Sequence, residues 1–149
     1  MKVAFYIRVN GAIYTSENKP NGAIYESYKK QEELCLDYAR NNGYEVVKIY
    51  RDCFTGRGME RPALKRMYRD ANKFEKIIVA DATRISRDFI QYTTVLNNFE
   101  DLGVTVETVC GDKAQEKLMY NIVTAVNEKI TTDLMKSIKD KYHLIPKRQ

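Results

Sequence analysis

The chain has 149 residues, of which 44% are hydrophobic and 30% are charged. This is the size and composition of one ordinary soluble domain that can bury a real core. No apolar run approaches the roughly 20 residues that a membrane helix needs, and Met1-Lys2-Val3 begins a strand rather than a signal peptide. These features exclude a membrane protein and predict a cytoplasmic one.

The three cysteines have no paired spacing, which argues against a disulfide framework and a zinc site and predicts a reducing compartment. We therefore expect neither a metal ion nor another cofactor. Cys35 lies on an expected helix face and Cys110 at an expected strand end, so both are predicted to be small core residues. Cys53 lies in a polar segment and receives no role.

The formal net charge is +5 at pH 7, and residues 136–149 contribute +4 of it. The rest of the sequence is almost neutral. Lys147 and Arg148 belong to this basic tail, which is either a solvated end or a contact for nucleic acid.

The first element is a nearly continuous apolar strand over residues 2–9, and Arg8 near its end is unusual. Buried strands of this type rarely carry a charge without a partner, so Arg8 predicts an anion nearby. The segment 10–20 is then repeated as 21–31, with seven of eleven positions identical. We interpret the first copy as an extra loop and the second as the lead into a helix.

The following elements alternate in type. We expect helices over 26–41, over 62–73 and from 87 or 88 to 102, strands over 44–50, 76–80 and 104–109, and a polar, glycine-punctuated loop over 51–61. The predicted buried stripe of the first helix consists of Tyr28, Leu34, Cys35, Tyr38 and Ala39. This order predicts an α/β domain of three layers, in which helices flank a mainly parallel sheet of four or five strands.

Two arginines, Arg84 and Arg87, follow the third strand where a helix should begin. In open α/β sheets ligands bind at this carboxyl edge, and planar guanidinium groups suit phosphate oxygens. The alternative interpretation is a pair of ion-paired surface arginines.

A long final helix begins near residue 115, and its apolar residues recur every four positions from Leu118 to Tyr142. Because this spacing exceeds the 3.6 residues of a helical turn, the stripe winds around the helix. Its downstream half then needs another surface, and a second copy or other protein is the natural candidate. The alternative is a long surface helix. We expect a division into an α/β domain, 1–112, and an oligomerisation helix with a basic tail, 113–149.

Five segments, in this order, resemble the catalytic domain of serine recombinases, the resolvase/invertase superfamily. They are Tyr6-Ile7-Arg8-Val9, Gln31, Tyr50-Arg51-Asp52 with Thr55-Gly56, Glu60-Arg61-Pro62-Ala63-Leu64, and Thr83-Arg84-Ile85-Ser86-Arg87-Asp88. In that family a serine attacks a DNA phosphodiester, arginines stabilise the phosphate, and subunits exchange to swap strands. The resemblance implies a phosphate clamp of Arg8, Arg84 and Arg87, a further phosphate contact from Arg61, and supporting polar groups in Thr55 and Gln31.

Two departures affect the implied chemistry. The family has its nucleophilic serine two residues after the strand arginine, where this protein has Asn10. A carboxamide has no hydroxyl to activate. The acid before the first arginine of the pair is replaced by Thr83, and Asp81 could partly substitute for it if the strand continues that far. The extra loop, residues 10–20, is inserted beside the implied active site.

The resemblance also implies DNA and a homodimer or higher oligomer, formed through the 115–142 helix, as partners. Family members usually continue into a DNA-binding region, whereas this sequence offers only its basic tail and no recognition helix. DNA binding is therefore expected to be weak or supplied by another protein.

Three hypotheses remain open. The first is a recombinase-fold protein with impaired cleavage that binds phosphate or DNA or oligomerises. The second is an active recombinase with a displaced nucleophile in the 11–20 loop, where Tyr14, Thr15 and Ser16 are candidates. The third is an unrelated phosphate-binding α/β domain.

Overall fold

The structure is a computed structural model that describes residues 1–54, 60–111 and 113–142. It divides into two compact units, Met1–Gly111 and Asp112–Gln149. No helix in the described ranges is long and apolar enough to cross a membrane.

The first unit is built on a sheet of four parallel strands in the order β2-β1-β3-β4. The strands are β1 (Lys2–Asn10), β2 (Glu45–Phe54), β3 (Lys76–Val79) and β4 (Thr105–Thr108). The prediction of a parallel sheet is confirmed. From β1 the chain adds β2 on one side and then β3 and β4 on the other side, so a topological switch point lies at β1. Ligands bind at such switch points in open α/β sheets.

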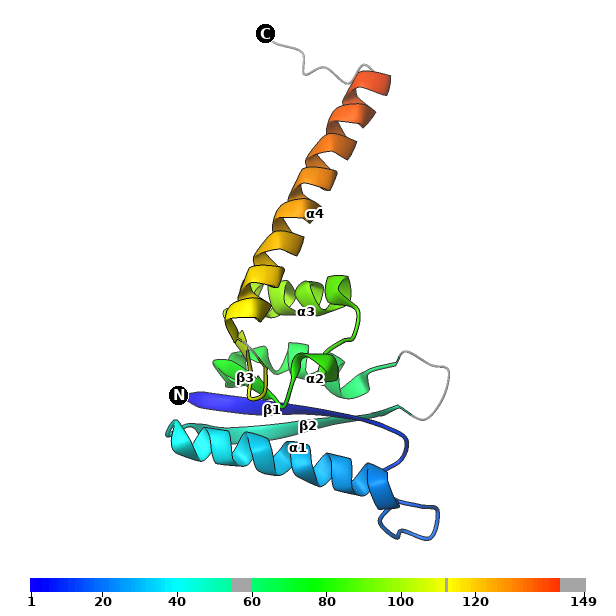
Figure 1. The fold of residues 1–149 in the computed structure, drawn as a ribbon, viewed down its shortest axis with the longest axis vertical. Helices are drawn as coiled ribbons and strands as arrows, with labels where there is room; N and C mark the ends of the chain where they lie inside the picture. The colour runs from blue at the N-terminus through cyan, green and yellow to red at the C-terminus, as the bar shows by residue number, and fades with distance from the viewer. Residues whose placement is uncertain (55–59, 112, 143–149) are drawn as a thin grey trace. The chain divides into compact units, whose positions relative to one another are not determined.

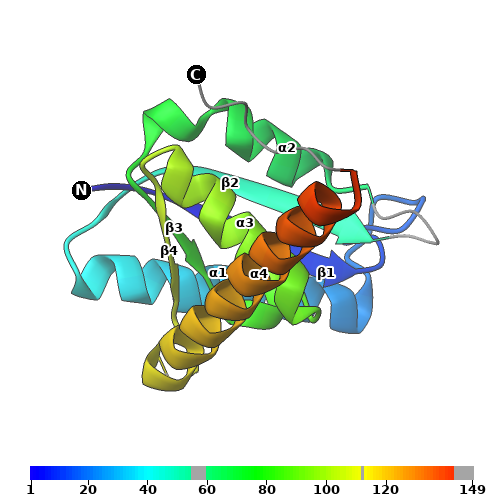
Figure 2. The same ribbon diagram turned by 90° about the horizontal axis from the view of Figure 1, so that it is seen from above.

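Helices cover both faces of this sheet (Figure 1). Helix α1 (Gly22–Asn41) lies on one face, and α2 (Pro62–Arg69) and α3 (Phe89–Asp101) lie on the other. In the view of Figure 2, α3 is in front of the strands and α1 is behind them. Short 3-10 turns, η1 (Ala71–Lys73) and η2 (Ala82–Arg84), complete the connections. The predicted three layers are confirmed.

The two faces of β1 enter different parts of the core. Val3 and Phe5 pack beneath α1, whereas Ala4 and Tyr6 pack beneath α2 and α3. Successive residues of a strand point to opposite faces. Arg8 therefore belongs to the α2/α3 face, like Tyr6. On that face, stacking of the Tyr68 and Phe99 rings, 4.2 Å between centroids, joins α2 to α3.

Several boundaries differ from the sequence-based expectation. Helix α1 begins at residue 22 instead of 26, and β2 continues to Phe54 instead of ending at 50. The helix that begins at Pro62 ends at Arg69, and only a 3-10 turn continues it. The long loop is shorter as a result, and the end of β2 reaches the same edge of the sheet as the end of β1.

Two predicted core positions are wrong. Leu34 is 41% exposed, and the buried stripe of α1 instead contains Gln31, which is only 3% exposed. A carboxamide is tolerated there because it makes hydrogen bonds to the β1 backbone. Cys110 is exposed, whereas Cys35 is buried as predicted.

The repeat has the two conformations that we expected. The first copy is a loop in which Tyr14 and Pro20 form an isolated antiparallel bridge, and the second copy begins α1. The copies also pack on each other: the rings of Tyr14 and Tyr25, which are equivalent positions, lie 5.9 Å apart. Ile13 and Ile24 join the same apolar cluster beneath α1. The insertion is therefore packed against the domain.

The described residues of the second unit form α4 (Lys113–Tyr142). The apolar residues of α4 that recur at spacing four are 37–59% exposed, and they are Leu118, Ile122, Val126, Ile130, Leu134 and Ile138.

Gly11 lies close to the Ile24 side chain, and this proximity yields a test. Its φ of +114° favours glycine, and a Cβ added there would lie 2.5 Å from Ile24 Cδ1. Gly11→Ala should lower the free energy of unfolding by about 1–3 kcal/mol. Gly22→Ala is the matched control, because the second copy leaves open space at that position. Urea unfolding followed by circular dichroism measures both, and equal losses would remove any role for the Gly11–Ile24 contact.

Candidate functional site

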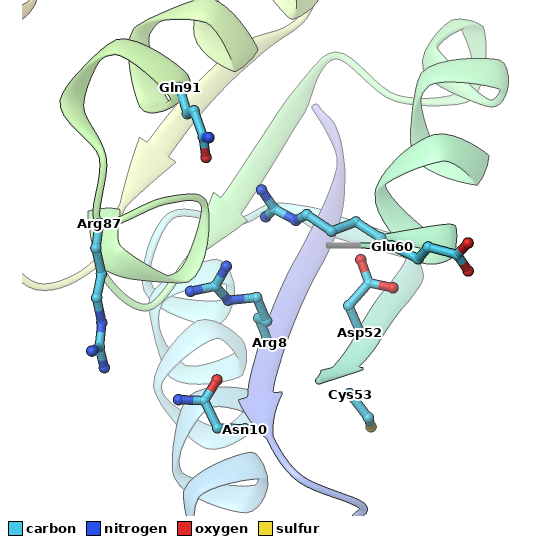
Figure 3. A pocket seen from close by; sticks show the side chains of 8 residues that line it. Arg8, Asn10, Asp52, Cys53, Glu60, Arg87 and Gln91 are labelled. Carbon is cyan, nitrogen blue, oxygen red and sulfur yellow. The ribbon is translucent and has the colours of Figure 1, made fainter. Parts of the chain in front are cut away.

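A cavity of about 220 Å³ lies at the carboxyl edge of the sheet, on the α2/α3 face. The end of β1, the end of β2, the residues before α2 and the start of α3 form its wall (Figure 3). The residues that line it are Arg8, Asn10, Asp52, Cys53, Glu60, Arg61, Arg87 and Gln91. Three arginines thus line one cavity.

Arg8 is the central cation of this cavity. Its Nη2 donates a hydrogen bond to the carbonyl oxygen of Thr83 at 3.2 Å. Burial is the main cause that lowers the pKa of Arg8, and the positive charge of Arg61 lowers it further. Arg87 and Arg84 act in the same direction. The guanidinium groups therefore repel one another, and an anion between them relieves this repulsion.

Arg61 is held by a buried polar network. Its Nε and Nη2 donate to the Tyr6 hydroxyl at 3.0 and 2.9 Å, and that hydroxyl donates to Asp52 Oδ2 at 2.7 Å. Burial raises the pKa of Tyr6 well above its ordinary value, so the phenol stays neutral. Arg61 therefore lines the cavity without a direct ion pair to any acid in the described ranges.

Asp52 anchors this network to α2. Its two carboxylate oxygens accept hydrogen bonds from the backbone N–H groups of Ala63, at 2.8 Å, and Leu64, at 3.1 Å. These amides belong to the first turn of α2, where N–H groups have no partner within the helix. Asp52 is only 4% exposed. Its role was not predicted, although an acid at a strand end shortly before the Pro62 helix is the pattern that could have indicated it.

Arg87 reaches the cavity from the segment before α3. Asp88 caps that helix, since its Oδ1 accepts from the backbone N–H of Ile90 at 2.8 Å and of Gln91 at 3.2 Å. The Ser86 hydroxyl accepts from the Asp88 N–H at 3.0 Å and donates to Gln91 Oε1 at 3.2 Å. The backbone at Arg87 is therefore fixed. Among the described residues, none accepts a hydrogen bond from the Arg87 guanidinium, which leaves it available to a ligand.

Arg84 differs from the expected three-arginine clamp, because its side chain lines a second cavity of about 540 Å³ near α1 and the end of β3. Its Nε lies 3.3 Å from Asp81 Oδ2, an ion pair without hydrogen-bond geometry. The expectation for Asp81 also needs correction. β3 ends at Val79, and Asp81 caps η2 by accepting from the N–H of Thr83 at 2.9 Å and from the Thr83 hydroxyl. Asp81 therefore lies outside the first cavity.

Gln31 supports the site from the opposite face of β1. Its Oε1 accepts from the Arg8 N–H at 3.3 Å, and its Nε2 donates to the Arg8 carbonyl at 3.1 Å. These two bonds fix the backbone from which the Arg8 side chain projects. Gln31 thus acts on the position of Arg8 and does not line the first cavity.

Asn10 lies in the cavity, and its carboxamide is on the same side as Arg8 and Arg87 (Figure 3). The loop hydroxyls do not line it: Tyr14 packs on Tyr25, and the Thr15 hydroxyl accepts from the Lys19 N–H at 3.3 Å. Ser16 is exposed elsewhere in the same loop. The expected contacts of Thr55, Lys147 and Arg148 lie outside the described residues.

This protein is similar to known recombinases over nearly its whole length. The family model "Resolvase, N terminal domain" matches residues 3–141. A "Putative DNA recombinase" of Bacillus subtilis (strain 168) is 28% identical over 131 residues, which make up 85% of this chain. A "Resolvase" of Clostridium perfringens (strain 13 / Type A) is 19% identical over 110 residues, 69% of this chain. The chain spans 24% and 56% of the lengths of these two relatives.

The fold is also that of a solved recombinase. A resolvase family site-specific recombinase from Streptococcus pneumoniae superposes with a TM-score of 0.64 at 22% identity, with 96% of this chain and 99% of that one covered. These matches remove the alternative of an unrelated phosphate-binding domain. With its parallel sheet and its match to the family model over residues 3–141, the chain belongs to the resolvase family of serine recombinases, through the family's N-terminal domain.

Proposed function

We propose that this domain binds the phosphate backbone of DNA in the arginine-lined cavity and is impaired in strand cleavage. The observation that supports this most directly is that Arg8, Arg61 and Arg87 line one cavity together with Asn10. The cations that would hold a phosphate are present, while the residue two positions after Arg8 lacks a hydroxyl.

The chemistry of these groups favours binding over cutting. Guanidinium groups donate charge-assisted hydrogen bonds to phosphate oxygens, which are roughly twice as strong as neutral ones. Strand cleavage through a covalent intermediate needs an oxygen or sulfur nucleophile, and a carboxamide provides none. A cavity of this composition stabilises a bound phosphodiester without attacking it at position 10.

Salt-dependent DNA binding tests the role of the arginines. Arg8→Gln or Arg87→Gln should weaken duplex binding and reduce the salt slope of the affinity by about 0.9 for each lost phosphate contact. Arg40→Gln is the matched control, because Arg40 is an exposed residue of α1 that pairs with Asp37. Fluorescence anisotropy over a range of salt concentrations gives both quantities. An unchanged slope in the Arg8 and Arg87 variants would rule out the cavity as the phosphate contact.

Trapping of a covalent adduct on a suicide DNA substrate tests whether strand cleavage is impaired. Wild type should form no adduct through position 10, and Asn10→Ser alone should restore little, because Thr83 still occupies the acid position and the 11–20 loop follows directly. Positioning errors of about 1 Å cost on the order of 100-fold in rate. Asn10→Ser with Thr83→Asp, and that pair with residues 10–31 reduced to one copy of the repeat, should trap progressively more DNA.

The displaced-nucleophile alternative predicts a different result in the same assay. Wild type would then trap DNA, and Ser16→Ala, Thr15→Ala or Tyr14→Phe would abolish the trapping. That outcome would overturn the proposal of impaired cleavage while leaving DNA binding intact.

We further propose that α4 assembles the protein into a dimer or higher oligomer. Its stripe includes Ile130 and Leu134, both 59% exposed, and a stripe of this kind gains free energy when a second copy covers it.

Charge substitution on this stripe tests the assembly. Ile130→Glu or Leu134→Glu should convert an oligomer to a monomer, because each places a carboxylate in the apolar contact. Thr132→Glu, on roughly the opposite side of the helix, should leave the oligomer intact. Sedimentation velocity reads the assembly state, and circular dichroism verifies folding. A wild type that remains monomeric at high micromolar concentration would contradict the proposal.

A further inference from the structure

Three Asn-Gly pairs occur in the sequence, Asn10-Gly11, Asn21-Gly22 and Asn42-Gly43. In such a pair the backbone nitrogen of glycine can attack the side-chain amide carbon (Cγ) of asparagine, because glycine has no side chain that blocks the approach. A new bond forms between these two atoms, the bond from that carbon to its NH₂ nitrogen breaks, and ammonia leaves with the proton of the attacking nitrogen. One water molecule then opens the cyclic imide to aspartate or isoaspartate.

Two of the three pairs are restrained. The Asn42 Nδ2 donates to the Tyr38 carbonyl at 2.8 Å, and the Gly43 N–H donates to the Arg40 carbonyl at 3.2 Å. Both reacting groups are thus engaged in the cap of α1.

The Asn21 side chain is engaged as well. Its Nδ2 donates to the Ala12 carbonyl at 2.9 Å, and its backbone N–H donates to the Ile13 carbonyl at 2.8 Å. Gly22 is already the first residue of α1.

The Asn10-Gly11 pair is not restrained in this way. Asn10 is the exposed last residue of β1, and no described residue makes a hydrogen bond with its carboxamide. Gly11 follows outside the strand with a φ of +114°. The end of the strand therefore leaves the Asn10 side chain free to turn toward the next peptide nitrogen.

The cavity also favours this reaction electrostatically. Attack by nitrogen places negative charge on the former amide oxygen, and preoriented cations stabilise such a developing charge. Arg8, Arg61 and Arg87 surround the same cavity. Two acids line it as well, but Asp52 is satisfied by the α2 amides, and Glu60 is exposed. The carboxylate product would replace a neutral group among three guanidinium groups.

From this geometry we infer that Asn10 is a self-modification site: it deamidates in preference to Asn21 and Asn42, and the new carboxylate occupies the arginine-lined cavity. The consequence for DNA rests on the proposed function. An acid at position 10 pairs with the arginines and repels phosphate, so the modified protein binds DNA about tenfold more weakly or worse.

Incubation of the full-length protein in heavy-oxygen water at mildly alkaline pH tests the modification, because opening of the imide incorporates one solvent oxygen. Cleavage after Glu17 separates Asn10 from Asn21, and mass spectrometry follows each site. Label should accumulate fastest at Asn10. Arg8→Gln should slow labelling at Asn10 and leave Asn21 and Asn42 unchanged. Labelling of Asn10 no faster than of Asn42, or at the same rate in Arg8→Gln, would overturn the inference.

The effect on DNA is measured separately with Asn10→Asp and Asn10→Gln. The aspartate variant should bind DNA at least about tenfold more weakly than the glutamine variant, which has the longer side chain but keeps a neutral carboxamide. Equal binding by the two variants would overturn the proposed consequence. Absence of DNA binding by wild type would instead reject the proposed function, and the labelling result would stand independently.

Discussion

The site depends on the hydrogen bonds that the Asp52 carboxylate accepts. This carboxylate joins the end of β2 to the first turn of α2 through two backbone amides, and it joins both to β1 through the Tyr6 hydroxyl. A buried carboxylate is costly unless its oxygens are satisfied, and here three donors satisfy them. Removal of this acid would leave the α2 amides and the phenol without an acceptor in the core.

The same network explains how arginines gather at the cavity without forming direct ion pairs with the nearby carboxylates. Tyr6 stands between Arg61 and Asp52, so the acid orients the guanidinium through a neutral group. Arg8 is held by a carbonyl instead of a carboxylate. By contrast, Arg84 has Asp81 beside it and lines the other cavity. Of these arginines at the sheet edge, the one that lies beside a carboxylate is therefore the one that does not line the arginine-rich cavity.

Much of this architecture could be predicted from sequence, because strand and helix periodicity is local. The apolar pattern of β1 identified Arg8 as unusual, and the break after β3 identified the region of Arg87. The direction of the Arg84 side chain could not be predicted, since it depends on where β3 ends and on the cap that Asp81 provides for η2. Gln31 was expected to support the site, but its burial in place of Leu34 depends on hydrogen bonds to a strand distant in sequence.

The stacked rings of Tyr68 and Phe99 have a mechanical consequence. Their interplanar angle is 14°, so α2 and α3 are joined by a flat ring contact that opposes sliding of one helix against the other. Arg61 precedes α2 and Arg87 precedes α3. The stacking consequently links the backbone segments that carry the two arginines, and adjustment to ligands of different width falls to the Arg87 side chain, whose guanidinium makes no hydrogen bond to a described residue.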